Sequence, residues 1–142
     1  MPLKMKIPNL SEEIKRLNVV AKKSDAIFKQ VAVRAGQAMQ NEIKSELAKA
    51  PYPTGGIAAG MMPLEADKIG DSVSIEVGWK LGPYPKNSTV PTSDGWKALF
   101  INYGTPHNKA YPFMDKASEE STKLARKEAR KAVTELIKEL NK

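Results

Sequence analysis

Residues 72–80, SVSIEVGWK, contain the clearest strand pattern in the chain, and they decide the class of fold. Apolar side chains at positions 73, 75, 77 and 79 alternate there with small or polar ones. This period places one face of a strand in a core and leaves the other face in water. Because a half-apolar sheet must be covered by another layer, the rest of the chain is expected to supply helices that pack on it.

A long amphipathic helix is predicted on the N-terminal side of this strand. Apolar residues recur there every four positions and would form one buried stripe. They are Ile27, Val31, Ala35, Met39, Ile43 and Leu47. Pro51 ends the pattern, because proline disfavours helical geometry in the residue before it. Ser11, followed by two glutamates, is predicted to cap a shorter helix upstream, with an interruption at residues 22–25.

A second long helix is predicted at the C-terminal end, from about Phe113 to Leu140. Pro112 suits the entrance to a helix, because proline has the backbone angle that the first turn needs. The residues expected to face the core are Ala117, Leu124, Ala125, Ala129, Val133, Leu136 and Leu140. Most of the lysines and arginines of this segment would lie on the opposite, solvated face.

Residues 96–103, WKALFINY, are predicted to form a strand of a different kind. Positions 98–101 are all apolar, so both faces of such a strand would need cover. We expect it to lie in the centre of the sheet or to face a partner chain. A weaker strand is predicted at residues 61–66, where Pro63 would confine it to an edge.

The expected architecture is one α+β domain that spans residues 1–142. A small antiparallel or mixed sheet of three to four strands would pack against a long helix in the N-terminal half and a long C-terminal helix. Residues 1–10 are expected to be a flexible N-terminus. Residues 82–95, GPYPKNSTVPTSDG, are expected to be a flexible loop, because their turn-forming residues show no periodicity.

The residues that usually carry catalysis or metal binding are scarce. The chain has no cysteine and one histidine, His107, so thiolate zinc sites and cysteine nucleophiles are excluded. His107 stands in a polar turn, and the carboxylates are dispersed without the spacing of a calcium loop. We therefore expect no catalytic residues, cofactor or metal. No stretch approaches the roughly 20 apolar residues of a membrane span, so no membrane partner is expected.

The net charge of +7 is concentrated in the two segments predicted to be helical. Lysine and arginine exceed aspartate and glutamate by five in residues 1–50 and by three in residues 116–142. Such charges usually form a solvated helix face. They also leave open an alternative function, a basic accessory protein that binds nucleic acid through phosphate contacts.

Residues 99–117, LFINYGTPHNKAYPFMDKA, resemble a pattern in the head–tail connector and tail-completion proteins of long-tailed bacteriophages and prophages. In that morphogenesis family an apolar strand runs into an aromatic-Gly-Thr turn, and Pro-Phe opens the final helix a few residues later. The residues at these places are Tyr103, Gly104, Thr105, Pro112 and Phe113; we call them the motif corner. Members of the family commonly have an acidic residue just before the aromatic one, where this chain has Asn102.

The resemblance implies a role in virion assembly without catalysis. Such proteins form rings, often of six subunits, at the head–tail junction or at the head-proximal end of the tail. The implied partners are further copies of the chain, the phage connector or neck and tail-tube proteins, and DNA touched without sequence recognition. The implied locations are the host bacterial cytoplasm during assembly and the neck or tail of the mature virion.

The surfaces that would make these contacts are predicted from the doubly apolar segment and the loop before it. The candidate interface residues are Ala98, Leu99, Phe100, Ile101, Tyr84 and Trp96. The motif corner can serve the same interface. It can also simply shape the passage from strand through turn to helix, since Gly104 permits backbone angles that other residues disfavour.

Overall fold

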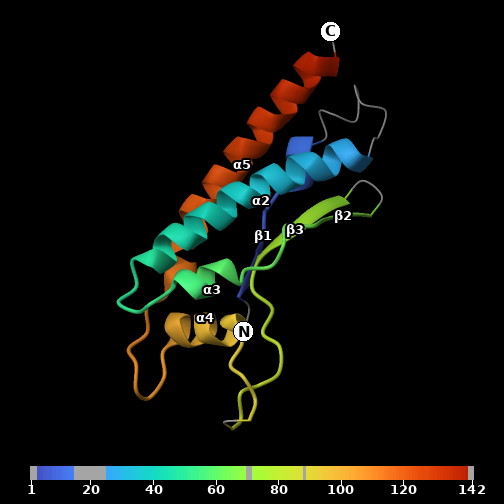
Figure 1. The fold of residues 1–142 in the computed structure, drawn as a ribbon. Coiled ribbons are helices and arrows are strands. Elements are labelled where there is room, and N and C mark those ends of the chain that lie inside the picture. The colour runs from blue at the N-terminus through green and yellow to red at the C-terminus, as the bar shows by residue number, and fades with distance from the viewer. Residues whose placement is uncertain (1–2, 15–24, 70–71, 88, 141–142) are drawn as a thin grey trace.

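The computed structural model describes residues 3–14, 25–69, 72–87 and 89–140. Within these ranges the chain forms a three-stranded sheet and several helices (Figure 1). The strands are β1 (Lys4–Lys6), β2 (Ala66–Ile69) and β3 (Ser72–Gly78). The helices are α2 (Asp25–Ala48), α3 (Gly55–Ala59), α4 (Asp94–Tyr103) and α5 (Phe113–Leu140), and residues 10–14 form a further helical turn. The predicted α+β class, with two long helices and an antiparallel sheet, is confirmed.

The sheet is built around β3, the strand that decides the fold. The order is β1-β3-β2, and both pairs are antiparallel. Met5 lies opposite Val77 on one side of β3, and Lys68 lies opposite Val73 on the other. The apolar side chains of residues 73, 75, 77 and 79 are all buried, which confirms the predicted alternation.

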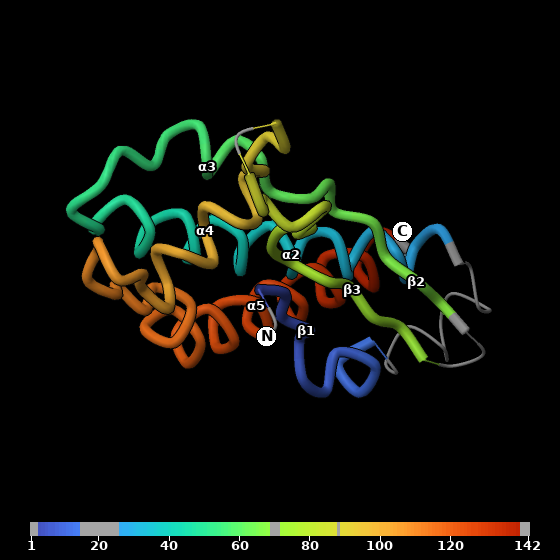
Figure 2. Tube along the Cα trace, turned by 90° about the horizontal axis from the view of Figure 1, so that it is seen from below, coloured from blue at the N-terminus to red at the C-terminus, as the bar shows by residue number. Residues whose placement is uncertain are grey.

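Helix α2 lies against the sheet and also packs along α5 (Figure 2). The apolar stripe of α2 is buried from Val31 to Leu47 at the predicted four-residue spacing. Gly36 allows the helix to approach β3, because a Cβ there would lie 2.9 Å from Cδ1 of Ile75. Helix α5 covers the other side of α2 with small residues such as Ala125 and Ala129, which are fully buried. The two long helices therefore form successive layers over the sheet.

The largest correction concerns residues 96–103, which were predicted to be a strand and form helix α4. The apolar run at 98–101 does not need cover on two sheet faces. On a helix, Ala98, Leu99 and Ile101 point into the core while Phe100 lies half-exposed on another side. A short apolar run fits a buried strand and a helix equally well. The cap at Ser93 is the local feature that favours the helix.

The predicted edge strand and N-terminus also differ from the structure. The edge strand is β2, at Ala66–Ile69, which begins where the predicted strand at 61–66 ends. The predicted flexible N-terminus instead contributes β1, and Leu3 and Ile7 are buried in the core. The predicted loop 82–95 ends earlier than expected, since Asp94 already begins α4.

The predicted cap at Ser11 has a different role. Its Oγ accepts a hydrogen bond from the N–H of Val73 at 2.9 Å and donates to the Val73 carbonyl at 3.2 Å. Ser11 therefore joins the helical turn at residues 10–14 to the beginning of β3. The predicted interruption at residues 22–25 falls almost wholly outside the described residues, which resume at Asp25 with α2. Among the helices that the structure describes, none has the length and apolar character needed to cross a bilayer.

Candidate interaction surface on helix α4

Helix α4 is positioned by contacts at its first turn. Ser93 precedes the helix in an extended conformation, and its Oγ accepts a hydrogen bond from the N–H of Trp96 at 3.3 Å. The same hydroxyl donates to the carbonyl of Leu81. Asp94 adds a negative charge in the first turn, where the helix dipole favours it. These contacts hold the helix against the segment that follows β3.

One side of α4 carries aromatic residues that are not buried in the core. Trp96, Phe100 and Tyr103 are spaced at i, i+4 and i+7, which places them on one helix face. Tyr84 joins them from the preceding loop. Its ring centroid lies 5.1 Å from that of Trp96, which lies 6.0 Å from that of Phe100. We call these four residues the aromatic surface.

Two residues of the aromatic surface are exposed, and the other two, Trp96 and Phe100, are partly buried and pack against the core. Tyr84 is 61% exposed and Tyr103 is 41% exposed, and they are the two exposed large apolar residues in the described part of the chain. Trp96 is fixed by a hydrogen bond from its Nε1 to the carbonyl of Gly82 at 3.1 Å. Exposed aromatic patches of this kind mark binding surfaces in soluble proteins.

A small pocket adjoins the aromatic surface and shares Phe100 with it. Its volume is about 180 Å³. The lining residues are Tyr52, Lys97, Phe100, Ile101 and Asn108; we call this the side-chain pocket. The Tyr52 hydroxyl donates a hydrogen bond to the carbonyl of Lys109 at 2.6 Å, which fixes one wall.

The motif corner turns the chain from α4 into α5. Gly104 ends α4 with φ +83° and ψ 170°, and its N–H donates to the carbonyl of Phe100 at 2.8 Å. Thr105 closes the following turn, because its Oγ1 accepts hydrogen bonds from the N–H groups of His107 and Asn108. The corner therefore holds Asn108 at the side-chain pocket.

The last two motif residues anchor the start of α5. Pro112 directly precedes the helix, and Phe113 is fully buried. The ring of Phe113 meets the buried ring of Trp79 edge to face, with 5.7 Å between centroids. Of the five motif residues, only the side chain of Tyr103 is largely exposed, and it alone belongs to the aromatic surface.

The structure divides the predicted interface residues into two groups. Tyr84, Trp96 and Phe100 come together on the aromatic surface. Ala98, Leu99 and Ile101 belong to the hydrophobic core instead, because a helix turns them inward where a strand would have left one face open. Ile101 belongs to the core and also lines the side-chain pocket.

Asn102 has a role that the sequence did not reveal. It is 2% exposed, and its Oδ1 accepts a hydrogen bond from the N–H of Met114 at 3.0 Å. It therefore satisfies an N–H in the first turn of α5, where such groups lack partners within the helix. Its Nδ2 has no hydrogen-bond partner among the described residues. A polar residue directly after a four-residue apolar run was the available signal.

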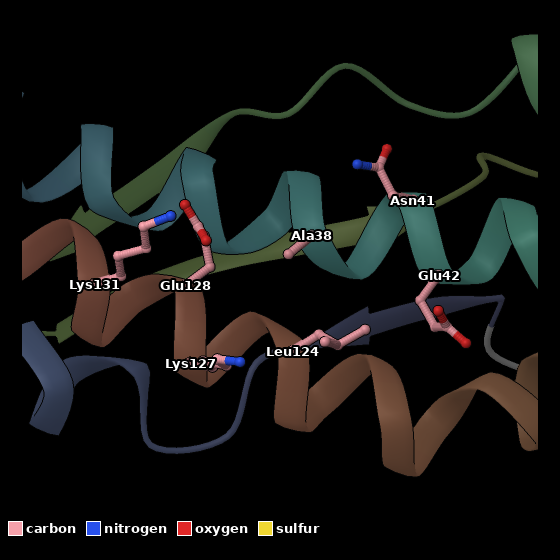
Figure 3. Close-up of a pocket in the computed structure, with 7 residues that line it drawn as sticks. All are labelled: Ala38, Asn41, Glu42, Leu124, Lys127, Glu128 and Lys131. Atoms are coloured by element: carbon pink, nitrogen blue, oxygen red, sulfur yellow. The ribbon is translucent and has the colours of Figure 1, made fainter.

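A second hollow lies between the two long helices (Figure 3). Its volume is about 580 Å³. It is lined by Ala38, Asn41, Glu42, Leu124, Lys127, Glu128 and Lys131. The apolar side chains in this groove are Ala38 and Leu124, and the remaining lining residues are polar with charges of both signs.

Several basic side chains of the helices are paired within the molecule. Arg34 contacts Glu128 at 2.7 Å and Glu135 at 2.8 Å, so that it joins α2 to α5. Hydrogen bonding to Glu135 and Glu128 raises the pKa of Arg34, and the bond from Arg34 lowers the pKa of Glu135. Arg126 and Arg130 both reach Glu13, at 3.6 and 2.9 Å.

The lysines around α4 differ from those arginines. Residues 80–112 contain four lysines and one aspartate. Among the described residues, no ion pair joins Lys80, Lys86, Lys97 or Lys109 to an acid. Asp94 is directed elsewhere, because its carboxylate lies beside Gly60. Lys80 lines a hollow together with Glu65, Asp67 and Glu76, whereas Lys97 shares the side-chain pocket with no acid.

The histidine and carboxylate side chains that could support catalysis do not gather at the aromatic surface. His107 is exposed in the turn closed by Thr105. In the described ranges, no three histidine or carboxylate side chains lie close enough together to hold a metal ion.

Neither a protein-family model, nor a curated protein, nor a solved structure matches this chain. The resemblance to phage connector and tail-completion proteins consequently depends on the residues of the motif corner themselves. The residues before the corner form helix α4, where the family pattern has an apolar strand.

Proposed function

We propose that the chain is a structural subunit of a ring at the head–tail junction, or at the head-proximal end of the tail, of a long-tailed bacteriophage or prophage. In this role it joins or completes the tail by binding other proteins and performs no catalysis. It would assemble in the host bacterial cytoplasm and remain in the virion neck or tail. The observation that carries the proposal is the partly exposed aromatic surface on α4, which adjoins the motif corner at Tyr103.

The chemistry of the aromatic surface supports protein binding. Tyrosine and tryptophan are enriched among the residues that contribute most to protein–protein affinity. Trp96 is held by Gly82, and its ring packs between those of Tyr84 and Phe100. Side chains that are already ordered lose less conformational entropy when a partner binds. The surface is therefore suited to stable, stoichiometric contact.

The ring arrangement follows from the resemblance and sets a geometric requirement. Subunits in a ring contact each other through two different surfaces, so that each copy offers one patch to the next. We propose that the aromatic surface is one of these patches or the contact to the neck or tail-tube protein. Further copies of the chain and those phage proteins are the proposed partners.

The proposal is tested by paired substitutions that leave the core intact. The variant Tyr84→Ser, Tyr103→Ser removes the two exposed aromatic rings, while Lys123→Ser changes an exposed residue of α5 as a control. We expect concentrated protein to form rings in negative-stain images and in light scattering. The tyrosine variant should remain monomeric, and the lysine variant should assemble normally.

The decisive result comes from particles made without the chain. The phage or prophage that encodes it should then produce heads and tails that fail to join, or unfinished tails. Normal tailed particles produced in its absence would overturn the proposal.

The alternative function is a basic accessory protein that binds nucleic acid. The exposed side chains of Lys86, Lys97 and Lys109, which form no ion pair among the described residues, favour it. The pairing of Arg34, Arg126 and Arg130 with acids weighs against a DNA site on the long helices. Binding through phosphates falls steeply with salt. A mobility-shift assay with duplex DNA at about 50 mM salt should detect such binding if it exists, and no retardation there would exclude this alternative.

A further inference from the structure

The side-chain pocket has the dimensions of a receptor for one amino-acid side chain. Its volume of about 180 Å³ lies below the roughly 300–1,000 Å³ of sites that enclose a whole small molecule. Phe100 and Ile101 supply apolar walls, and the ring of Tyr52 supplies another. One apolar side chain projecting from a partner would fill it.

The walls of the pocket are fixed before any partner arrives. The Tyr52 hydroxyl is bonded to the carbonyl of Lys109 at 2.6 Å. The N–H of Asn108 donates to Oγ1 of Thr105 at 3.0 Å, and the carbonyl of Asn108 accepts from the N–H of Thr105 at 2.9 Å. The N–H of Tyr111 donates to the carbonyl of Ile101 at 2.7 Å, which keeps the returning chain close to α4. A pre-formed pocket of this kind loses little entropy on binding.

The charge at the pocket selects the partner. Lys97 is exposed and stands at the pocket without an ion-pair partner among the described residues. Lys109, whose carbonyl accepts the Tyr52 hydroxyl at the pocket wall, is also exposed and has no ion-pair partner among the described residues. An acidic segment would be attracted to this face, and a basic one would be repelled.

We infer that the side-chain pocket binds one large apolar side chain of an acidic protein segment, with Lys97 pairing with a carboxylate beside that side chain. This inference rests on the proposed assembly function and deepens it, because it names the chemistry of the partner at the same surface. The aromatic surface extends the contact beyond the pocket, since Phe100 belongs to both.

Single-stranded nucleic acid is the competing ligand for lysines beside aromatic rings. Successive bases of single-stranded nucleic acid stack on exposed faces of aromatic rings. Here Tyr84 and Trp96 meet at 83°, and Trp96 and Phe100 at 37°, so the rings pack on each other and do not form a row of parallel platforms. The geometry favours an inserted side chain over stacked bases.

The test uses a synthetic peptide with one phenylalanine flanked on both sides by glutamates. It is titrated into the ¹⁵N-labelled full chain, and the two indole N–H signals are followed by NMR. The ring of Trp96 contacts that of Phe100, which lines the pocket, whereas Trp79 is buried and donates a hydrogen bond to the carbonyl of Ile57. We expect a saturable shift of the Trp96 signal and no shift of the Trp79 signal.

Two further peptides separate the two parts of the inference. Replacing the phenylalanine by alanine should weaken binding by about tenfold or more, because burial of a large apolar side chain is lost. Replacing the glutamates by glutamines should weaken it by a similar factor at low salt and by less at high salt. Equal affinity of the alanine peptide would overturn the pocket as the binding site.

Lys97→Glu is matched with Lys29→Glu, which reverses an exposed lysine on α2 and leaves the same net charge. We expect Lys97→Glu to weaken binding of the phenylalanine peptide by about tenfold and Lys29→Glu to leave it unchanged. Equal effects of both variants would show attraction to net charge alone and would overturn the inference. So would an oligothymidylate that shifts the Trp96 signal at lower concentration than the peptide does.

The result is separable from the proposed function. Peptide binding by a chain that forms no ring and is dispensable for tailed particles would contradict the assembly role alone. A chain that assembles through the aromatic surface but shows no saturable peptide binding would contradict the pocket inference alone.

Discussion

Asn102 in the last turn of α4 and Gly104 directly after the helix determine how the chain enters α5. The Oδ1 of Asn102 accepts a hydrogen bond from the N–H of Met114 and so links the last turn of α4 to the first turn of α5. Gly104 then takes φ +83° and ψ 170°, a combination that is essentially restricted to glycine. With Phe113 buried against Trp79, these residues orient the loop that carries Asn108 to the side-chain pocket.

Gly104→Ala should lower the free energy of unfolding by about 1–3 kcal/mol, because alanine is strained at these backbone angles. The added Cβ would also lie 3.0 Å from the backbone nitrogen of Ala110. Gly55→Ala is the control, since a Cβ at Gly55 meets nothing within 4 Å. Urea unfolding should show the control within about 1 kcal/mol of wild type. Equal effects of the two substitutions would contradict the role assigned to Gly104.

At the scale of elements, α2 and α5 are joined by packing along their buried faces and by Arg34 at the edge. Arg34 donates to Glu128 and Glu135, which lie two helical turns apart on α5. The hydrogen bond from Arg34 holds the pKa of Glu135 below its ordinary value of 4.5. A carboxylate with a lowered pKa stabilises the folded state above its unfolded pKa and loses that contribution as the pH falls through the folded value.

Arg34→Met should consequently lower Tm most at neutral pH. The difference in Tm between wild type and variant should shrink as the pH falls below 4.5 and through the lowered folded-state pKa of Glu135, where the carboxylate becomes protonated and loses its pairing with Arg34. The contribution should also diminish at high salt, because the contact is partly exposed. Thermal melts followed by circular dichroism from pH 7 to about pH 3 would measure it, and a difference independent of pH would contradict the assignment.

Strand β1 is an element of the fold and not a tail. The Leu3 carbonyl accepts the N–H of Trp79, and the Leu3 side chain is buried. Leu3→Ala should therefore cost about 2–5 kcal/mol of unfolding free energy. Lys4→Ala, which breaks a surface pair with Glu76, should cost no more than about 1 kcal/mol. Equal losses of unfolding free energy for the two substitutions would contradict the burial of Leu3 in the core.

For the whole molecule, one cluster of buried side chains joins the sheet to the described helices. Trp79 lies in it, where its ring contacts Phe113 of α5 and its Nε1 donates to the carbonyl of Ile57 in α3 at 2.8 Å. The charged side chains fall into two groups, one on the long helices and one around α4. The arginines of the long helices are paired with acids, while the lysines around α4 are not. The described residues therefore share one core, and the acidic partner proposed above would meet the face of α4 that carries Lys97.

A single core predicts a single cooperative unfolding transition. In a Trp96→Phe variant, fluorescence reports Trp79 alone, since the chain has two tryptophans. The fluorescence change and the loss of far-ultraviolet ellipticity should have the same midpoint in urea. Separate midpoints would show that the helices and the sheet form independent units.

The sequence alone determined the elements with strong periodicity: the alternation in β3, the four-residue stripe of α2 and the helix from Phe113 to Leu140. These patterns suffice because one period matches one buried face. The four apolar residues at 98–101 carried no such period, and their helical state was decided by the Ser93 cap and by core positions for Ala98 and Leu99. The aromatic surface and its pocket likewise arise only in the tertiary structure, because the loops on either side of α4 fold back to place Tyr84 and Asn108 beside it and Tyr52 arrives from a distant segment of the chain.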